Sequence, residues 1–112
     1  MWKILFIPEA MKDLKHMDNN IKHQVLTGIN KVGKNPLPKR EGGYGNPLGN
    51  IKGHDLTGFF KIKYQGIGIR VVYALKRSEM KMIIIVISAR ANDQSYKEAQ
   101  KRNLKYMSDF KV

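Results

Sequence analysis

The sequence predicts one α+β domain: an N-terminal strand and a helical hairpin packed on a mainly antiparallel four-stranded sheet, then a C-terminal helix. Apolar residues recur at helical spacing up to residue 33, and runs typical of strands fill residues 58–88. The chain has 112 residues, enough for one core with little room for two. We therefore expect residues 1–112 to form a single domain.

The N-terminal third predicts a strand and two helices. The apolar run at residues 2–7 ends at Pro8, a residue that suits the first turn of a helix. Apolar side chains at helical spacing follow over residues 11–17 and again over 21–32. The polar cluster at 18–20 separates the two helices, so we expect a helical hairpin.

A long loop is predicted between the hairpin and the sheet. Residues 35–57 are rich in Pro and Gly and show no clear periodicity. The run Gly42-Gly43-Tyr44-Gly45 lacks the strand–loop–helix setting of a phosphate-binding loop, so we interpret it as a mobile loop tip. Because neither flank could form a core alone, the segment is expected to be a loop within the domain and not a linker.

The C-terminal half predicts three strands and a helix. Residues 58–64 and 67–75 predict an antiparallel pair joined by a turn at Gln65-Gly66. The β-branched run at 80–88 is typical of a buried central strand. Ser95-Tyr96-Lys97-Glu98 matches a capping box and predicts the start of the final helix.

The charge of the chain points to a polyanionic partner. There are 21 Lys and Arg against 9 Asp and Glu, a net charge of +12. Residues 57–112 carry 12 basic and 4 acidic groups, against 9 and 5 in residues 1–56, so the sheet and final helix form the more basic half. The longest apolar runs are too short to span a bilayer. We expect a cytoplasmic protein without a membrane partner.

Strand alternation gathers basic side chains on one face of the predicted sheet. Lys61 and Lys63 alternate with apolar residues, and Arg70 lies opposite the apolar face of the next strand. If the apolar faces join one core, these three side chains converge on the open face. Arg90 ends the buried strand and Tyr96 begins the next helix. Each signal alone is unspecific, since charged strand faces also discourage edge pairing.

Taken together, these residues resemble the RelE family of bacterial toxins. The resemblance covers most of the chain and is strongest between residues 56 and 102. It rests on Phe60-Lys61-Ile62-Lys63, on Gly68 to Tyr73, on Val86 to Arg90, and on Tyr96 with the run from Glu98 to Arg102. The loop around residues 42–55 and the tail beyond 102 are longer than in compact members of the family.

The resemblance implies an α+β fold of the microbial-ribonuclease type and an endoribonuclease that cuts messenger RNA on the ribosome. It implies catalytic roles for Lys61, Lys63, Arg70, Arg90 and Tyr96. The implied partners are messenger RNA on the ribosome, ribosomal RNA and an acidic antitoxin that forms a toxin–antitoxin system with it. Operator DNA would be contacted only through the antitoxin complex.

The chemistry of RNA cleavage agrees with this residue set. Attack by the 2′-hydroxyl needs a proton acceptor and stabilisation of the developing phosphate charge. Neighbouring cations lower the pKa of a lysine from its usual value of about 10.4, so either Lys61 or Lys63 could act as the base. Arg70 and Arg90 suit forked contacts to phosphate. Tyr96 could stack on a base or orient the hydroxyl.

Other candidate sites are weaker. His16 and His23 are expected to be solvated, and His54 in the long loop has no clear partner other than Asp55. The chain has no cysteine, and its histidines lack further ligands, so we expect neither a metal nor another cofactor. Two alternatives remain: a relative of the ParE branch that poisons DNA gyrase without cutting RNA, and a plain RNA-binding module.

Overall fold

The computed structural model describes residues 1–51, 54–89 and 94–105. Its main sheet has five strands in the order β1-β7-β6-β5-β2. The long strands are β5 (Phe59–Tyr64), β6 (Ile69–Lys76) and β7 (Lys81–Ala89), which form an antiparallel meander. Strand β1 (Lys3–Phe6) runs parallel to β7 at one edge. The predicted α+β architecture and the mainly antiparallel sheet are therefore confirmed.

The fifth strand corrects the expected number of four. It is β2 (Asn46–Pro47), a two-residue strand that pairs with β5 from within the predicted loop. The same segment also contains the 3-10 helix η1 (Lys39–Glu41) and a small ladder between β3 (Asn50–Ile51) and β4 (His54–Asp55). Strands of two residues are too short to leave a hydrophobic period, which is why the sequence indicated only a loop.

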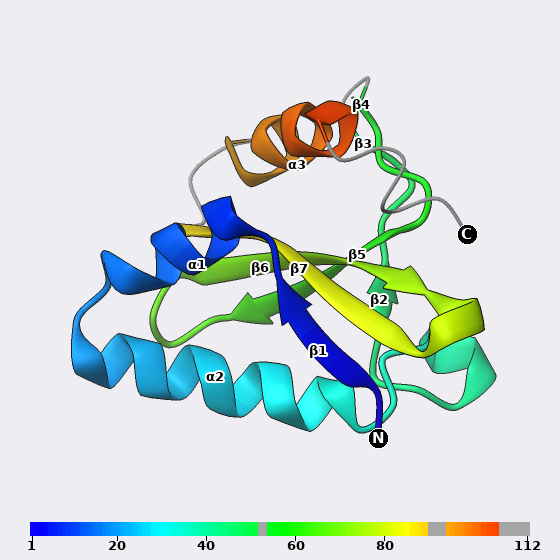
Figure 1. Ribbon diagram of the computed structural model, residues 1–112, viewed down its shortest axis with the longest axis horizontal. Helices are drawn as coiled ribbons and strands as arrows, with labels where there is room; N and C mark the ends of the chain where they lie inside the picture. Colours follow the sequence, from blue (N-terminus) through cyan, green and yellow to red (C-terminus); the bar gives the residue numbers. More distant parts are fainter. Residues whose placement is uncertain (52–53, 90–93, 106–112) are drawn as a thin grey trace.

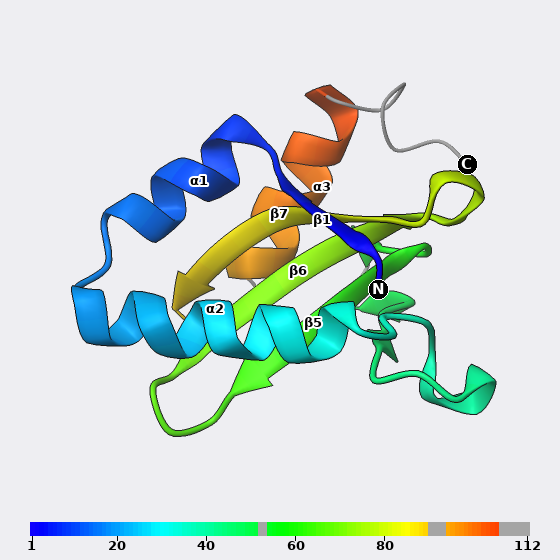
Figure 2. The same ribbon diagram turned by 60° about the horizontal axis from the view of Figure 1, so that its bottom comes forward.

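The sheet lies between helices on its two faces. Helix α2 (Asn19–Gly33) crosses one face and α3 (Gln94–Lys105) the other, as both views show (Figure 1, Figure 2). Helix α1 (Pro8–Lys15) contacts β7, whereas α2 contacts β1 and β5. The two helices follow each other as predicted, with the Asp18 side chain accepting a hydrogen bond from the Ile21 amide at 2.9 Å.

The core beneath α2 is the apolar face that alternation predicts. Phe60 on β5 stacks on Tyr73 on β6, with ring centroids 5.0 Å apart. The Tyr64 hydroxyl donates to the Val25 carbonyl of α2 at 2.7 Å, and burial raises the pKa of this phenol. Gly28 allows this close approach, because a Cβ there would collide with the Tyr64 ring. Within the described residues, no helix is long and apolar enough to cross a membrane.

Candidate active site

The strand register places the predicted basic residues side by side. Lys63 on β5 pairs with Arg70 on β6, and Arg70 in turn pairs with Ser88 on β7. Lys61 pairs with Val72 one step along the same face. Side chains directly opposite each other on paired strands share a face, with Cβ atoms about 5 Å apart. The structure therefore brings Lys61, Lys63 and Arg70 together, as the alternation predicted.

This face is less open than the sequence suggested, because α3 covers part of it. The Ser95 hydroxyl of α3 lies 2.6 Å from the Ser88 hydroxyl of β7. The Tyr96 ring lies over the Arg70 guanidinium, whose carbon is 4.5 Å from the ring centroid. Lys63 on β5 stays exposed, whereas Arg70 is half-buried. The basic residues thus line the boundary between β5 and the start of α3.

Arg70 is an unusual side chain in this setting. Its Nε and Nη1 atoms are buried and have no hydrogen-bond partner among the residues that the structure describes. Buried donors in folded proteins are nearly always paired. Two unpaired guanidinium donors on one side chain therefore point to an acceptor that is not part of the described structure. A phosphate oxygen is the acceptor that a guanidinium fork fits best.

Tyr96 occupies a more buried position than a base-stacking residue would need. Only 6% of its surface is exposed, and one face of its ring covers Arg70. The ring is therefore placed to hold the guanidinium by a cation–π contact. The predicted helix start is corrected here: α3 begins at Gln94, and Ser95 bonds to Ser88 instead of capping the helix. Arg90 lies outside the described residues.

A polar network that the sequence did not reveal fixes α3 to the edge of β7. Arg102 of α3 donates to both Asp13 carboxylate oxygens of α1, at 2.8 and 3.2 Å, and to the Ile85 carbonyl at 2.7 Å. Asp13 also accepts from the Ile87 amide at 3.0 Å. These bonds satisfy backbone groups on the edge of β7 that faces away from β6, beyond Ile84, the last residue that pairs with β1.

The charges of this network support one another. Burial disfavours the charged guanidinium, but the hydrogen bonds and charges of Asp13 and Glu98 outweigh it and raise the pKa of Arg102. The Glu98 carboxylate lies 2.9 Å from the Arg102 Nε. Asp13 and Arg102 are 89 residues apart, so no local pattern could have paired them. The network positions the helix that carries Tyr96.

His16 and His23 do not form a site, and the His54 side chain lies outside the described part of the structure. His16 Nδ1 lies 2.8 Å from the Lys12 carbonyl at the end of α1, and His23 is exposed on α2. Asp55 is used by its own turn: its carboxylate accepts from the Thr57 hydroxyl at 2.7 Å and the Thr57 amide at 3.1 Å, which lowers its pKa. Across the described segments, no three His, Asp or Glu side chains gather as potential metal ligands.

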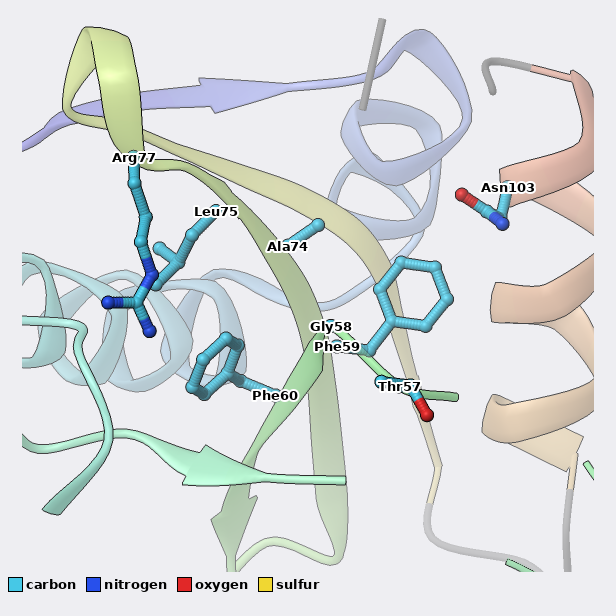
Figure 3. A pocket seen from close by; sticks show the side chains of 8 residues that line it. All are labelled: Thr57, Gly58, Phe59, Phe60, Ala74, Leu75, Arg77 and Asn103. Carbon is cyan, nitrogen blue, oxygen red and sulfur yellow. The ribbon is translucent and has the colours of Figure 1, made fainter. Parts of the chain in front are cut away.

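A pocket of about 360 Å³ lies at the other end of the β5–β6 pair (Figure 3). Phe59 of β5 and Asn103 of α3 lie toward one side of it and Arg77 toward the other, with Ala74 between Phe59 and Arg77 in this view. Its lining is mostly apolar, and it contains none of the predicted site residues. The candidate active site is therefore the Lys63–Arg70 end of the sheet and not this pocket.

Comparison with known proteins identifies the fold. The chain matches no protein-family model and no curated protein. It is similar to the isolated RelE toxin of E. coli, with a TM-score of 0.66 and 20% identity over 91% of this chain and 98% of that chain. A double mutant of the same toxin in the free state gives a TM-score of 0.71 and 22% identity, over 90% and 96%.

A third similar structure is the RelBE2 toxin–antitoxin complex of Mycobacterium tuberculosis. Its TM-score is 0.62 at 21% identity, over 80% of this chain and 98% of that chain. At these identities the comparisons show similarity of fold, which is the α+β architecture described above. The chain therefore has the fold of the RelE toxins.

Proposed function

We propose that this chain is the toxin of a type II toxin–antitoxin system and an endoribonuclease that cuts messenger RNA on the ribosome. One observation carries the proposal: Lys63 pairs with Arg70, with Lys61 on the same face, and the buried donors of the Arg70 guanidinium lack a partner among the described residues. Neither Lys63 nor Arg70 forms an ion pair within the described part of the chain. This arrangement suits an incoming phosphodiester.

The proposed reaction is a transesterification. The RNA 2′-oxygen attacks the adjacent phosphorus while Lys61 or Lys63, in its neutral form, takes the hydroxyl proton. The bond from phosphorus to the 5′-oxygen then breaks, and a proton is returned to that oxygen. The products are a 2′,3′-cyclic phosphate and a 5′-hydroxyl. One P–O bond forms, one breaks and one proton is transferred, so the reaction requires no metal or other cofactor.

The arginines are assigned to the charge that develops on the phosphate. Arg70 is held flat by Tyr96, and its buried Nε and Nη1 atoms must be uncovered before the guanidinium can bind the phosphate oxygens. For Arg90, the role of stabilising the charge on the phosphate rests only on the sequence resemblance. Tyr96 acts as a positioning residue for Arg70, and its hydroxyl remains the candidate for orienting the 2′-hydroxyl.

The partners follow from the same proposal. A chain with a net charge of +12 is expected to bind ribosomal RNA and messenger RNA, and to be neutralised by an acidic antitoxin. RelE of E. coli has been solved as an intact RelBE toxin–antitoxin complex. Operator DNA would be contacted through such a complex, and the expected location is the cytoplasm.

Single-turnover cleavage of messenger RNA on programmed ribosomes tests the proposal. Lys63→Ala should lower the cleavage rate by a factor of about 10² or more while ribosome binding persists. Lys15→Ala removes the same charge from an exposed position on α1 and should cleave normally. The product of the wild-type protein should carry a 2′,3′-cyclic phosphate.

Equal cleavage by Lys63→Ala and Lys15→Ala would remove Lys63 from the mechanism, and equal cleavage by Lys61→Ala/Lys63→Ala as well would remove both lysines. A wild-type protein that leaves messenger RNA intact would overturn the nuclease assignment. A supercoiling assay with DNA gyrase would then test the ParE-like alternative directly.

A further inference from the structure

The segment that follows α2 is a loop whose backbone groups hydrogen-bond one another. The Tyr44 amide donates to the Asn35 carbonyl at 2.8 Å, and the Gly45 amide donates to the Leu37 carbonyl at 2.9 Å. A Cβ on Gly45 or on Gly43 would collide with carbonyl groups of this loop. The glycines at positions 43 and 45 therefore serve close backbone packing, a role that the sequence did not indicate.

A pocket of about 380 Å³ lies between η1 and β2 in this segment. Lys39, Arg40 and Asn46 contribute its polar groups, and Leu48 lies at its apolar wall. Lys39 and Arg40 are exposed and form no ion pair with any residue that the structure describes. The pocket is therefore preformed and bears two positive charges.

The single acidic residue of η1, Glu41, pairs with a residue outside the pocket. Glu41 binds Arg77 through a fork, with oxygen–nitrogen distances of 2.9 and 3.2 Å. This hydrogen-bonded pairing lowers the pKa of Glu41, so the carboxylate stays ionised and paired. The charge of Arg40 also contributes to lowering the pKa of Glu41, but the direct ion pair of Glu41 is with Arg77. Lys39 and Arg40 therefore remain available to bind an anion.

Strand β2 connects this pocket to the candidate active site. Asn46, which lines the pocket, is the direct strand partner of Lys61. Partners across a strand pair share a face, so the Asn46 amide and the Lys61 side chain are neighbours. Moving along one row of the sheet from Lys61 therefore leads to Asn46 and then into the pocket.

We propose that the pocket between η1 and β2 binds a backbone phosphate of the same RNA strand, away from the bond that is cut. Lys39 and Arg40 supply the charge, and the Asn46 amide hydrogen-bonds the sugar or phosphate between the two sites. The inference rests on the proposed function and extends it from the scissile phosphate to a flanking one. RNA fits better than an acidic protein helix, because Leu48 is buried and the pocket offers charges instead of an apolar groove.

A double-mutant cycle between protein and substrate tests this proposal. Messenger RNAs that carry one neutral methylphosphonate each, at successive positions around the cut, are cleaved on programmed ribosomes. In the wild-type protein, one flanking position should slow cleavage about tenfold. In Lys39→Ala/Arg40→Ala the same methylphosphonate should cause no further loss, since its protein partner is already absent.

The matched control is Lys12→Ala/Lys15→Ala, which removes two exposed charges from α1. It should stay as sensitive to the flanking methylphosphonate as the wild type. Asn46→Asp provides a second variant, whose added carboxylate should repel the RNA and slow cleavage at subsaturating protein.

The possible results distinguish a failure of the pocket inference from a failure of the proposed function. If Lys39→Ala/Arg40→Ala responds to every methylphosphonate as the wild type does, the pocket binds no RNA phosphate and the inference is overturned. Weaker binding of a polyglutamate peptide by that variant, with unchanged cleavage, would assign the pocket to an acidic protein and also overturn it. If the wild-type protein cleaves nothing, the proposed function itself has failed.

Discussion

Among single residues, Arg70 combines a charge with surroundings that do not satisfy it. The Tyr96 ring covers the guanidinium from one side, and two of its nitrogens are buried without a partner in the described structure. Leaving donors unpaired in this way costs free energy of folding. The cost is offset when a phosphate arrives, which would make the residue more useful for catalysis than for stability.

Substitutions at Arg70 and Tyr96 separate charge from geometry. Arg70→Lys keeps the charge but loses the planar fork, so cleavage should fall by a factor of about 10²–10³. Tyr96→Phe keeps the ring over Arg70 and should retain much more activity than Tyr96→Leu, which removes it. Single-turnover rates at saturating ribosomes measure both effects, and ribosome binding serves as the reference.

Two results would contradict this account of the residue pair. Near-normal cleavage by Arg70→Lys would show that charge alone suffices. Equal losses in Tyr96→Phe and Tyr96→Leu would show that the hydroxyl acts on the substrate and that the ring does not merely position Arg70.

Among the secondary-structure elements, α3 is the one on which the site depends most. It carries Tyr96, and its attachment to the sheet runs through Arg102, Asp13 and the free edge of β7. Only 12% of the Arg102 side chain and 21% of the Asp13 side chain are exposed. Loss of this attachment should therefore affect both stability and the position of Tyr96.

Asp13→Ala tests this attachment. It leaves the Arg102 guanidinium and the Ile87 amide without their acceptor, so the free energy of unfolding should fall by about 1.5–3 kcal/mol. Urea denaturation measures the change at constant m-value. Cleavage should fall as well, although Asp13 lies outside the proposed set of reacting groups.

Glu79→Gln is the matched control. Its carboxylate pairs with Lys76 and Lys81, but 42% of the side chain is exposed, and solvent screens such surface pairs so that they contribute little to stability. A loss in Asp13→Ala no larger than that of Glu79→Gln would show that α3 is held by apolar packing instead.

For the whole molecule, the net charge of +12 is the dominant property. Binding to RNA phosphates releases counterions, so the logarithm of the affinity falls linearly with the logarithm of the salt concentration. The described ion pairs tie up some of the cations, including Arg77, Arg102 and Lys105. Exposed lysines outside these pairs, such as Lys15 and Lys63, can bind a polyanion.

Ribosome affinity measured across a salt series should show this linear fall. Lys61→Ala/Lys63→Ala should make the slope shallower by about 0.7–0.9 for each phosphate contact that is lost. A slope that is flat in the wild type would remove polyanion recognition from the account. A slope that is steep but unchanged in the variant would place the RNA on another face.

Much of this protein follows from local sequence patterns. The three long strands and both N-terminal helices lie within a few residues of their predicted positions, because helical and alternating periods are properties of neighbouring residues. The same alternation places Lys61, Lys63 and Arg70 on one face, as the register confirms. The role of Arg90, which lies outside the described residues, stays a prediction from the sequence.

Tertiary structure decided how these groups are used. The sequence could not show that α3 covers part of the basic face, that Tyr96 lies over Arg70, or that Asp13 binds Arg102. It also could not show that Asn46 pairs with Lys61, because a two-residue strand has no period of its own. These contacts join residues far apart in the chain, and their energies depend on burial and distance that only the folded molecule sets.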